Sequence, residues 1–327
     1  MYNQTEAILS QYEIEVKQTT KGRGSYICDT DKGKKMLVAF RGSPERGEAL
    51  AQYLKFLQEA GFVVEQIFPN KEEKAVTVDE ISGERFILKS FLEGAEVEPS
   101  KKEEIRVGAR LLGEYHVCSK KILPQNLPPI FTETNTSVLD TKNRHYRELI
   151  KIRNHIRSKK KKNDFERQFM ENCNSMLKTA TDSLTLLEKM EWNKEDFCFC
   201  HGDYNQHNIV KSDGKWHIIH MEGVTYSLPM EDVANYLRKM MEKNHWDIVL
   251  GRSLLSEYEK SIPLEEKDKK HLYALLLFPE RFWKITNHYM NSHKAWVSQR
   301  DIEKLEKVIA QEEKRLNFIE NLFSFEE

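Results

Sequence analysis

The chain has 327 residues, which is long enough for two packed lobes with separate cores. Its 51 Lys and Arg residues nearly balance 52 Asp and Glu residues, and a formal net charge of −1 points to neither nucleic acid nor an anionic membrane as a partner. A content of 31% charged and 10% aromatic residues is typical of a folded protein. No window of the sequence approaches the ~18 consecutive apolar residues of a membrane span. We therefore expect no nucleic acid partner and no membrane insertion.

The first part of the chain has the pattern of a small sheet with one helix. Residues 12–40 alternate apolar and polar side chains between glycine-containing turns, which predicts an antiparallel meander. Ser43 and Pro44 then suit the start of a helix, and Gly61 suits its end. The apolar stripe of this helix comprises Leu50, Tyr53, Leu54 and Leu57. Further strands are predicted at 62–67, 75–79 and 85–91.

The later part of the chain is predicted to be mainly helical. Helices are expected at about 100–119, across 139–190, from Pro229 onward and across 248–325. The basic run at 157–162 either grips an acidic partner or is a solvated helix face or loop. The near-neutral chain and the absence of interleaved aromatic residues favour the second interpretation.

The five cysteines are scattered and lack the spacing of zinc ligands. Cys198 and Cys200 are two residues apart on a predicted strand, so their side chains point to the same face. This placement suits core packing better than a disulfide bond.

Residues 197–223 predict a strand, a tight loop and a second strand, with a turn at 212–214. Within this stretch His201-Gly202-Asp203, followed five residues later by Asn208, has the H-x-D-x-x-x-x-N spacing of a phosphotransferase catalytic loop. In that chemistry the aspartate accepts the proton of the substrate hydroxyl, and the asparagine holds a metal ion. Asp203 is therefore the candidate base and Asn208 a candidate metal ligand.

In its H-G-D form this loop resembles the aminoglycoside-phosphotransferase and choline-kinase-like branch of the kinase fold. The resemblance implies an α+β, two-lobed protein-kinase-like fold, with a small antiparallel-sheet N-lobe and one main helix at 1–94 and a large helical C-lobe at 95–327. For an active member it also implies ATP and Mg²⁺ as cofactors, bound in part by the interlobe segment that contains Lys89 and Phe91. Asp232 matches an aspartate that, in this superfamily, caps a helix and braces the H-G-D loop.

Two positions depart from that pattern. The metal-binding aspartate expected after the second strand is replaced by His220, and a neutral imidazole offers Mg²⁺ neither charge nor oxygen. The nucleotide-binding lysine expected on the strand before the main helix falls on Val38, which cannot bind phosphate. Each loss of an electrostatic stabiliser costs on the order of 10²–10³ in rate, so the two together leave little activity.

Substitutes for the lost groups are limited. Lys34, Lys35 and Arg41 are the basic residues that a shift in strand register would bring to the lysine position, and Glu222 is the remaining carboxylate candidate for a metal held by Asn208. His217 and His220 are expected to face opposite sides of a strand, which argues against a metal shared by the two.

Further stretches resemble the CotS family of spore coat proteins. They are residues 83–94, 111–116, 200–208, 232–239, 278–289, 292–296 and 304–306. The resemblance implies a protein that is made in the mother-cell cytoplasm and deposited in the spore coat, with other spore coat proteins as partners.

Two functions are consistent with these residues. The first is a structural or assembly protein of the spore coat with degenerate catalysis, in which His201, Asp203 and Asp232 brace the loop. The second is an ATP-dependent phosphotransferase acting on a small hydroxylated molecule or a coat glycan, with Asp203 as base and with Asn208 and Glu222 on the metal. The residues at 38 and 220 favour the first.

Overall fold

The computed structural model describes residues 2–22, 24–133, 137–292 and 298–323. Of the 292–296 stretch, only Ser292 lies within these ranges. The chain forms two compact units: the first comprises Met1–Glu98, Leu111–Asn135 and Phe197–Leu228, and the second comprises Pro99–Arg110, Thr136–Asp196 and Pro229–Glu327. The lobe boundary expected at residue 94 stays a prediction.

The first unit combines strands with a few helices. Its elements are α1 (Tyr2–Leu9), β1 (Val16–Lys21), β2 (Ser25–Thr30), β3 (Lys35–Ala39), α2 (Pro44–Glu59), β4 (Ile67–Phe68), β5 (Thr77–Val78), β6 (Arg85–Ser90), β7 (Ala95–Glu96), α4 (Ile130–Glu133), β8 (Cys198–Cys200), β9 (Ile209–Ser212), β10 (Lys215–Ile218) and β11 (Thr225–Ser227). Helix α3 (Lys102–Lys120) contributes its second half to this unit and its first half to the other.

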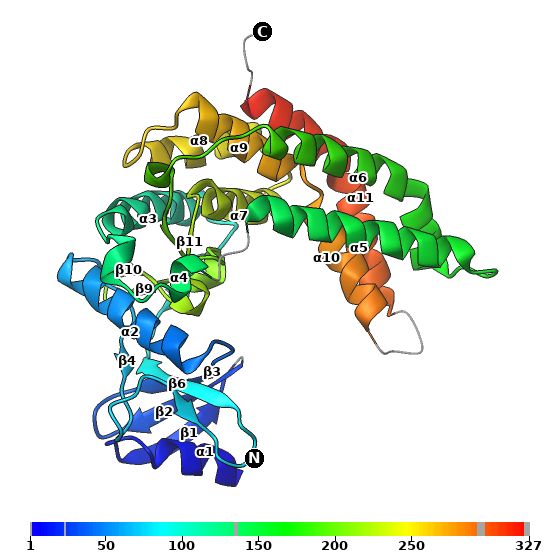
Figure 1. The fold of residues 1–327 in the computed structure, drawn as a ribbon. Helices are drawn as coiled ribbons and strands as arrows, with labels where there is room; N and C mark the ends of the chain where they lie inside the picture. Colours follow the sequence, from blue (N-terminus) through cyan, green and yellow to red (C-terminus); the bar gives the residue numbers. More distant parts are fainter. Residues whose placement is uncertain (1, 23, 134–136, 293–297, 324–327) are drawn as a thin grey trace. The chain divides into compact units, whose positions relative to one another are not determined.

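The main sheet of the first unit is antiparallel, with strand order β1-β2-β3-β6-β4 and β5 paired to β6 (Figure 1). The predicted meander is therefore present, but its first strand begins at Val16 rather than at residue 12. Tyr12 lies before that strand and is buried in a core with Leu37 of β3 and Leu88 of β6. Helix α1, which was not expected, adds Ile8 and Leu9 to the same core.

Helix α2 forms where its local signals predict. The Ser43 side chain accepts a hydrogen bond from the backbone N–H of Arg46, Pro44 occupies the first turn, and Gly61 adopts a φ of 84° just beyond the end. The predicted stripe of Leu50, Tyr53, Leu54 and Leu57 is buried.

The strand predicted at 62–67 is wrong over most of its length. Only Ile67 and Phe68 form β4, and Val64 makes an isolated bridge to Ile218. The alternation of apolar and polar residues suggested a strand here. In the structure the Glu65 side chain is buried and accepts hydrogen bonds from the backbone N–H groups of His220 and Met221. The strand predicted at 75–79 is likewise shorter, because β5 consists of Thr77 and Val78.

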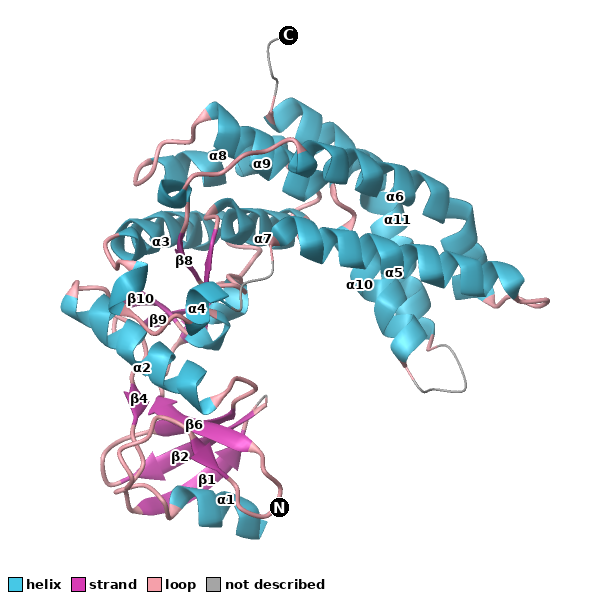
Figure 2. Ribbon diagram, viewed as in Figure 1, coloured by secondary structure: helices cyan, strands magenta, loops and turns pink. Residues whose placement is uncertain are grey.

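The described residues of the second unit form helices joined by loops, without a strand among them (Figure 2). Its helices, besides the first half of α3, are α5 (Val138–Ser158), α6 (Asp164–Glu188), α7 (Met230–Met241), α8 (Ile248–Glu259), α9 (Glu266–Leu277), α10 (Glu280–Asn291) and α11 (Gln299–Leu322). Its core joins apolar side chains of α5, α6, α10 and α11, such as Ile152, Phe169, Phe282 and Leu305. The basic run 157–162 ends α5 and forms the link to α6, where Arg157, Lys160 and Lys161 are exposed. Within the described ranges no helix has the length and apolar character needed to cross a bilayer.

Candidate functional site

The H-G-D loop leaves β8 and passes through a 3₁₀ turn at Gln206–Asn208 into the β9–β10 hairpin. That hairpin closes with Asp213 and Gly214, both at positive φ, which is the two-residue turn expected for this pair. Strand, loop and hairpin all belong to the first unit.

His201 is completely buried and braces the loop from inside. The backbone N–H of Asp203 donates to Nδ1 of His201 at 3.2 Å, so the ring proton lies on Nε2, which donates to the carbonyl oxygen of Ile219 at 3.0 Å. The imidazole thereby ties the H-G-D loop to the chain just beyond β10.

The backbone carbonyl of Asp203 is also held from within the loop. It accepts hydrogen bonds from the side-chain amides of Asn205 at 2.7 Å and of Asn208 at 2.9 Å. The Asp203 residue is exposed, whereas Asn208 is only 8% exposed. Asn208, the predicted metal ligand, therefore uses its amide nitrogen to fix the shape of the loop.

Gly202 and Gly223 pack backbone against backbone. Gly202 has a φ of 80°, and a Cβ atom built on it would lie 2.2 Å from the carbonyl oxygen of Gly223. Both the conformation and the space require glycine at 202. The glycine of the H-G-D motif is therefore explained by the backbone structure of the loop, without reference to catalysis.

An ion cluster in the same unit is centred on Lys89 of β6. The Lys89 side chain is fully buried, and its ammonium donates to Oε1 of Glu65 at 3.0 Å, to Nδ1 of His220 at 3.3 Å and to Oε1 of Glu222. An ammonium has three donors, and each has a partner here. We call Lys89, Glu65 and Glu222 the Lys89 triad.

Glu65 also fixes the turn that follows β10. Its carboxylate accepts the backbone N–H of His220 at 3.1 Å and that of Met221 at 2.8 Å. His220 has a left-handed backbone, with φ 61° and ψ 51°, an uncommon conformation for a residue other than glycine. The expectation that His220 lies on a strand is wrong, because β10 ends at Ile218 and the turn held by Glu65 follows it.

The pKa values in the cluster follow from burial and charge. Burial disfavours the charged form of Lys89, but the charges of Glu65 and Glu222 outweigh it and raise the pKa of Lys89. Burial alone would raise the pKa of Glu222, yet the charge and hydrogen bond of Lys89 lower it overall. Burial and then the charge of Lys89 lower the pKa of His220, so its imidazole is neutral at pH 7.

A cavity of about 760 Å³ in the first unit adjoins this cluster. Its lining includes Val38, Arg41, Arg46, Glu222 and Gly223. Such a volume is typical of ligand sites, which occupy roughly 300–1,000 Å³.

The position expected to carry the nucleotide lysine is in the wall of this cavity and is apolar. Val38 of β3 pairs with Ile87 of β6, and Met36 pairs with Lys89. Since side chains alternate along a strand, Val38 and Lys89 point to the same face of the sheet. The lysine on that face is thus supplied by the neighbouring strand, where it is enclosed by glutamates.

Arg46, in the first turn of α2, is the basic residue that the sequence analysis missed. Its Nη2 atom donates to the carbonyl oxygen of Val224 at 2.6 Å, and its guanidinium lies 5.2 Å from the ring centre of Phe131. Its position three residues after the helix cap Ser43 could have indicated this role. Side chains in the first turn of a helix that borders a cleft can point into that cleft.

The other basic candidates differ in their surroundings. Arg41 lines the cavity, Lys34 forms an exposed ion pair with Glu93 at 2.8 Å, and Lys35 lies over the ring of Phe68. Among the described residues that line the cavity, Arg41 and Arg46 are the cations.

The two remaining predicted residues have other settings. The backbone N–H of Phe91 donates to the carbonyl oxygen of Lys34 at 3.4 Å, within the first unit. Asp232 is buried in the first turn of α7 and belongs to the second unit. Their expected roles, together with those of His201, Asp203, Asn208 and Glu222, stay predictions.

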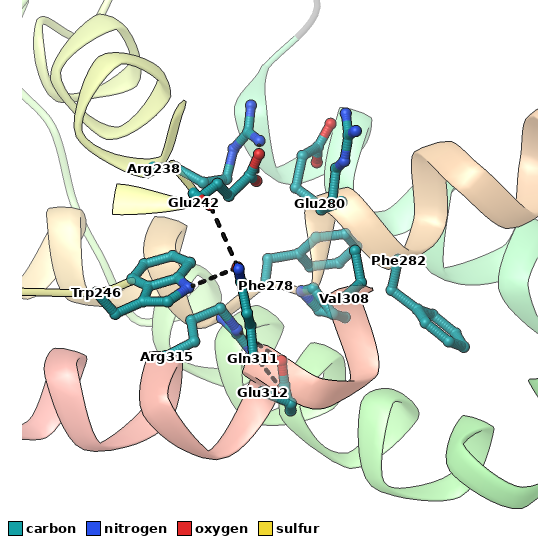
Figure 3. A pocket seen from close by; sticks show the side chains of 12 residues that line it. Arg238, Glu242, Trp246, Phe278, Glu280, Phe282, Val308, Gln311, Glu312 and Arg315 are labelled. Atoms are coloured by element: carbon teal, nitrogen blue, oxygen red, sulfur yellow. Dashed lines mark hydrogen bonds and ion pairs between the residues drawn. The ribbon is translucent and has the colours of Figure 1, made fainter. Parts of the chain in front are cut away.

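A second, much smaller pocket of about 30 Å³ lies among α7, α10 and α11 of the second unit. Trp246 donates from Nε1 to Oε1 of Gln311 at 3.3 Å, and Gln311 donates from Nε2 to the carbonyl oxygen of Glu242 at 3.4 Å (Figure 3). Arg238 and Arg315 each form an ion pair with a neighbouring glutamate of their own helix or its end. The volume is that of about one water molecule, so we assign no ligand to it.

The antiparallel sheet with its main helix, the helical second part and the H-G-D loop define the aminoglycoside-phosphotransferase-like branch of the protein-kinase fold. An aminoglycoside phosphotransferase from Alicyclobacillus acidocaldarius subsp. acidocaldarius is 18% identical, with a TM-score of 0.80 over 97% of this chain and 94% of that chain. The microcompartment-associated aminopropanol kinase is 13% identical, with a TM-score of 0.67 over 99% of this chain and 98% of its own. At these identities the likeness establishes the fold alone.

Comparison of sequences narrows this class. The family model described as "Spore coat putative kinase YutH" matches residues 5–322, and the chain belongs to that family. Spore coat protein S of Bacillus subtilis (strain 168) is 26% identical over 332 residues, covering 96% of this chain and 92% of that protein. The predicted kinase-like α+β fold and the resemblance to CotS-type spore coat proteins are confirmed.

Proposed function

We propose that this chain is a structural or assembly component of the spore coat whose kinase-like cleft is degenerate in catalysis. The observation that carries the proposal is the ion pair between Lys89 and Glu222. Glu222 is the carboxylate that would have to replace the missing metal-binding aspartate at 220. Because a buried lysine already pairs with it, a magnesium ion would have to compete with that lysine for the same group.

The rest of the cleft supports the same conclusion. Val38 brings no charge to a phosphate, although it lines the cavity at the position expected to carry the nucleotide lysine. The features that preserve the H-G-D loop, namely the bonds of His201 and the packing of Gly202, serve its shape whether or not a phosphoryl group is transferred. Phosphoryl transfer depends almost entirely on positioning and charge, and these are the terms that are weakened.

The place of action follows from the family. A spore coat role implies synthesis in the mother-cell cytoplasm, deposition on the forespore and contacts with other spore coat proteins. The similarity to spore coat protein S along nearly the whole chain supports this part of the proposal.

The alternative function is an ATP- and Mg²⁺-dependent phosphotransferase acting on a small hydroxylated molecule or a coat glycan. One observation favours it: the cavity of about 760 Å³ has a size that suits a ligand, and Arg41, Arg46 and Glu222 are among its lining residues. In this alternative Asp203 is the base, and the two arginines replace the strand lysine.

Thermal melting separates the two. A ligand that binds only the folded state must raise the melting temperature, so the purified protein is melted with millimolar ATP and Mg²⁺, with Mg²⁺ alone, and with ATP and EDTA. The proposed function predicts no rise that depends on both nucleotide and metal. A rise that EDTA abolishes, and that the Arg46→Ala variant loses relative to its own ligand-free melting temperature, would establish the phosphotransferase alternative.

A second experiment separates assembly from chemistry. Sporulating cells carry either the wild-type protein or Asp203→Ala, and both the location of the protein and the modification state of coat components are recorded. The proposal predicts normal deposition and an unchanged coat with the variant. A folded variant that is deposited normally but leaves a coat component unmodified would overturn it.

A further inference from the structure

We infer that His116, Cys198 and Cys200 form a binding site for one zinc ion inside the first unit. His116 lies in the second half of α3, and the two cysteines lie on β8, immediately before the H-G-D loop. All three residues are buried, with exposed fractions of 0%, 1% and 1%. Structural zinc sites use this kind of buried thiolate and imidazole set.

The distances suit a single ion. The ligand atoms of the three residues all lie within 4.8 Å of one another, and the two sulfur atoms are 3.9 Å apart. Two Zn–S bonds of about 2.3 Å that meet at a tetrahedral angle separate the sulfurs by about 3.8 Å. The two thiols are therefore placed at the spacing of zinc ligands without any movement of the strand.

Charge balance selects the ion. Two thiolates and a neutral imidazole carry two negative charges, which a divalent cation cancels, so the complex would be neutral in a site that excludes water. A singly charged copper ion would leave a net buried charge, and Mg²⁺ avoids sulfur ligands. Binding releases the two thiol protons to solvent, because the metal replaces them on sulfur.

A fourth ligand is available from the backbone. The thiol of Cys200 donates to the carbonyl oxygen of Ser227 on β11 at 3.5 Å. This is about the separation of a sulfur and an oxygen bound to the same tetrahedral zinc ion. Ligation would thus join α3, β8 and β11 at one point.

The role that this geometry gives the ion is structural. It would tie the chain that leads directly into His201 to α3, independently of any nucleotide in the cavity. The sequence spacing of the cysteines did not suggest a zinc site because the third ligand, His116, lies far earlier in the chain and meets them only in the fold.

The test measures metal directly. The protein is purified under reducing conditions, titrated with Zn²⁺ and analysed by native mass spectrometry and elemental analysis. We expect one zinc ion per chain, with at least a tenfold loss of affinity in Cys198→Ser, Cys200→Ser and His116→Gln. The matched control is Cys173→Ser, which alters a 1%-exposed thiol on α6 in the second unit and should keep the ion.

A spectroscopic measurement on the wild-type protein tests the site even if the variants fail to fold. Co²⁺ bound to the wild-type protein in place of Zn²⁺ should show sulfur-to-metal charge-transfer absorption and the visible bands of tetrahedral cobalt. The inference is overturned by a reduced wild-type protein that binds no zinc, by binding that survives all three substitutions, or by bound cobalt without thiolate absorption. Copper at one ion per chain, or a disulfide between Cys198 and Cys200 in the reduced preparation, would also overturn it.

Discussion

The ammonium of Lys89 lies 2.9 Å from Oε2 of Glu65, and neither side chain is more than 3% exposed. Since a buried charge is tolerated only with a partner, these two residues depend on each other. The same ammonium holds Glu222, so one lysine joins the sheet strand β6, the segment before β4 and the turn after β10. The cluster consequently fixes the geometry of the segment in which a kinase keeps its metal-binding residue.

Replacing Lys89 with methionine should be strongly destabilising. The substitution keeps the length of the side chain but leaves the buried Glu65 and the partly exposed Glu222 without their cation. Breaking a buried pair such as Lys89–Glu65 costs about 3–5 kcal/mol. Urea unfolding monitored by circular dichroism measures the change in unfolding free energy. The control, Lys34→Met, removes an ion pair whose side chains are 44% and 71% exposed and should change stability by less than about 1 kcal/mol. Equal effects in the two variants would mean that the Lys89 triad contributes no more than a surface pair.

Gly202→Ala should destabilise the first unit more than Gly33→Ala. Both glycines have a φ of 80°, so both variants pay the left-handed backbone penalty of about 1–2 kcal/mol. A Cβ at 33 meets nothing within 4 Å, whereas at 202 it lies 2.2 Å from the backbone of Gly223, which has to move. Differential scanning calorimetry compares the two variants. Identical melting temperatures would show that the close approach of Gly202 and Gly223 carries no energetic constraint.

His201→Ala should lower stability by about 1–3 kcal/mol, because it removes the hydrogen bonds to the Asp203 amide and the Ile219 carbonyl in a buried setting. His207→Ala is the control within the same loop, since His207 pairs with Glu96 at 2.5 Å but its side chain is 47% exposed. This control should stay within about 0.5 kcal/mol of the wild type. Chemical denaturation at pH 7 provides both values, and a larger loss for His207→Ala would contradict the bracing role of His201.

Glu280 should make the protein sensitive to acid. Burial alone would raise its pKa, but the charge of Lys142, 2.6 Å away, and the neighbouring His145 lower the pKa well below its usual value. A depressed pKa in the folded state contributes stability above the unfolded-state pKa of about 4.3, and this contribution is lost as the pH falls through the folded-state pKa.

Glu280→Gln tests this directly. The variant should be less stable than the wild type at pH 7, and the difference should shrink as the pH falls below about 4.3. Urea unfolding at a series of pH values measures both curves. The control Glu93→Gln alters a carboxylate that is 71% exposed and should leave the pH dependence nearly unchanged. A constant difference between wild type and Glu280→Gln across this range would refute the assignment.

The sequence predicted those elements whose signals are local. Helix α2 carries its own cap and stripe, and the β9–β10 turn carries its own Asp-Gly pair, so both were predictable from neighbouring residues. The prediction at 62–67 was wrong because the residues alternate as in a strand. The carboxylate of Glu65 is bonded by the backbone of His220 and Met221, which are distant in sequence and cannot be found from a local pattern.

The arrangement of the site could not be predicted in the same way. The H-G-D spacing identified the loop, but Lys89, Glu65 and Glu222 come from three separate parts of the chain and meet only through tertiary packing. Counting back from Ser43 placed the expected lysine position on Val38, which stays a prediction, and it could not show that a lysine on the same face of the sheet comes from β6. Arg46 lies in the first turn of α2 rather than on the strand, and only the fold brings it to the cavity.

The Lys89 triad holds two carboxylates and one ammonium, so the three ionised groups together carry one net negative charge. An aspartate at position 220 would add a third negative charge beside a single cation, in a cluster where Glu65 is 3% and Glu222 is 22% exposed. Changing Lys89 or Glu65 alone would break a buried ion pair, and changing Glu222 alone would remove one partner of the same lysine. The three positions are thus coupled, and we expect a substitution at any one of them alone to lower the stability of the first unit.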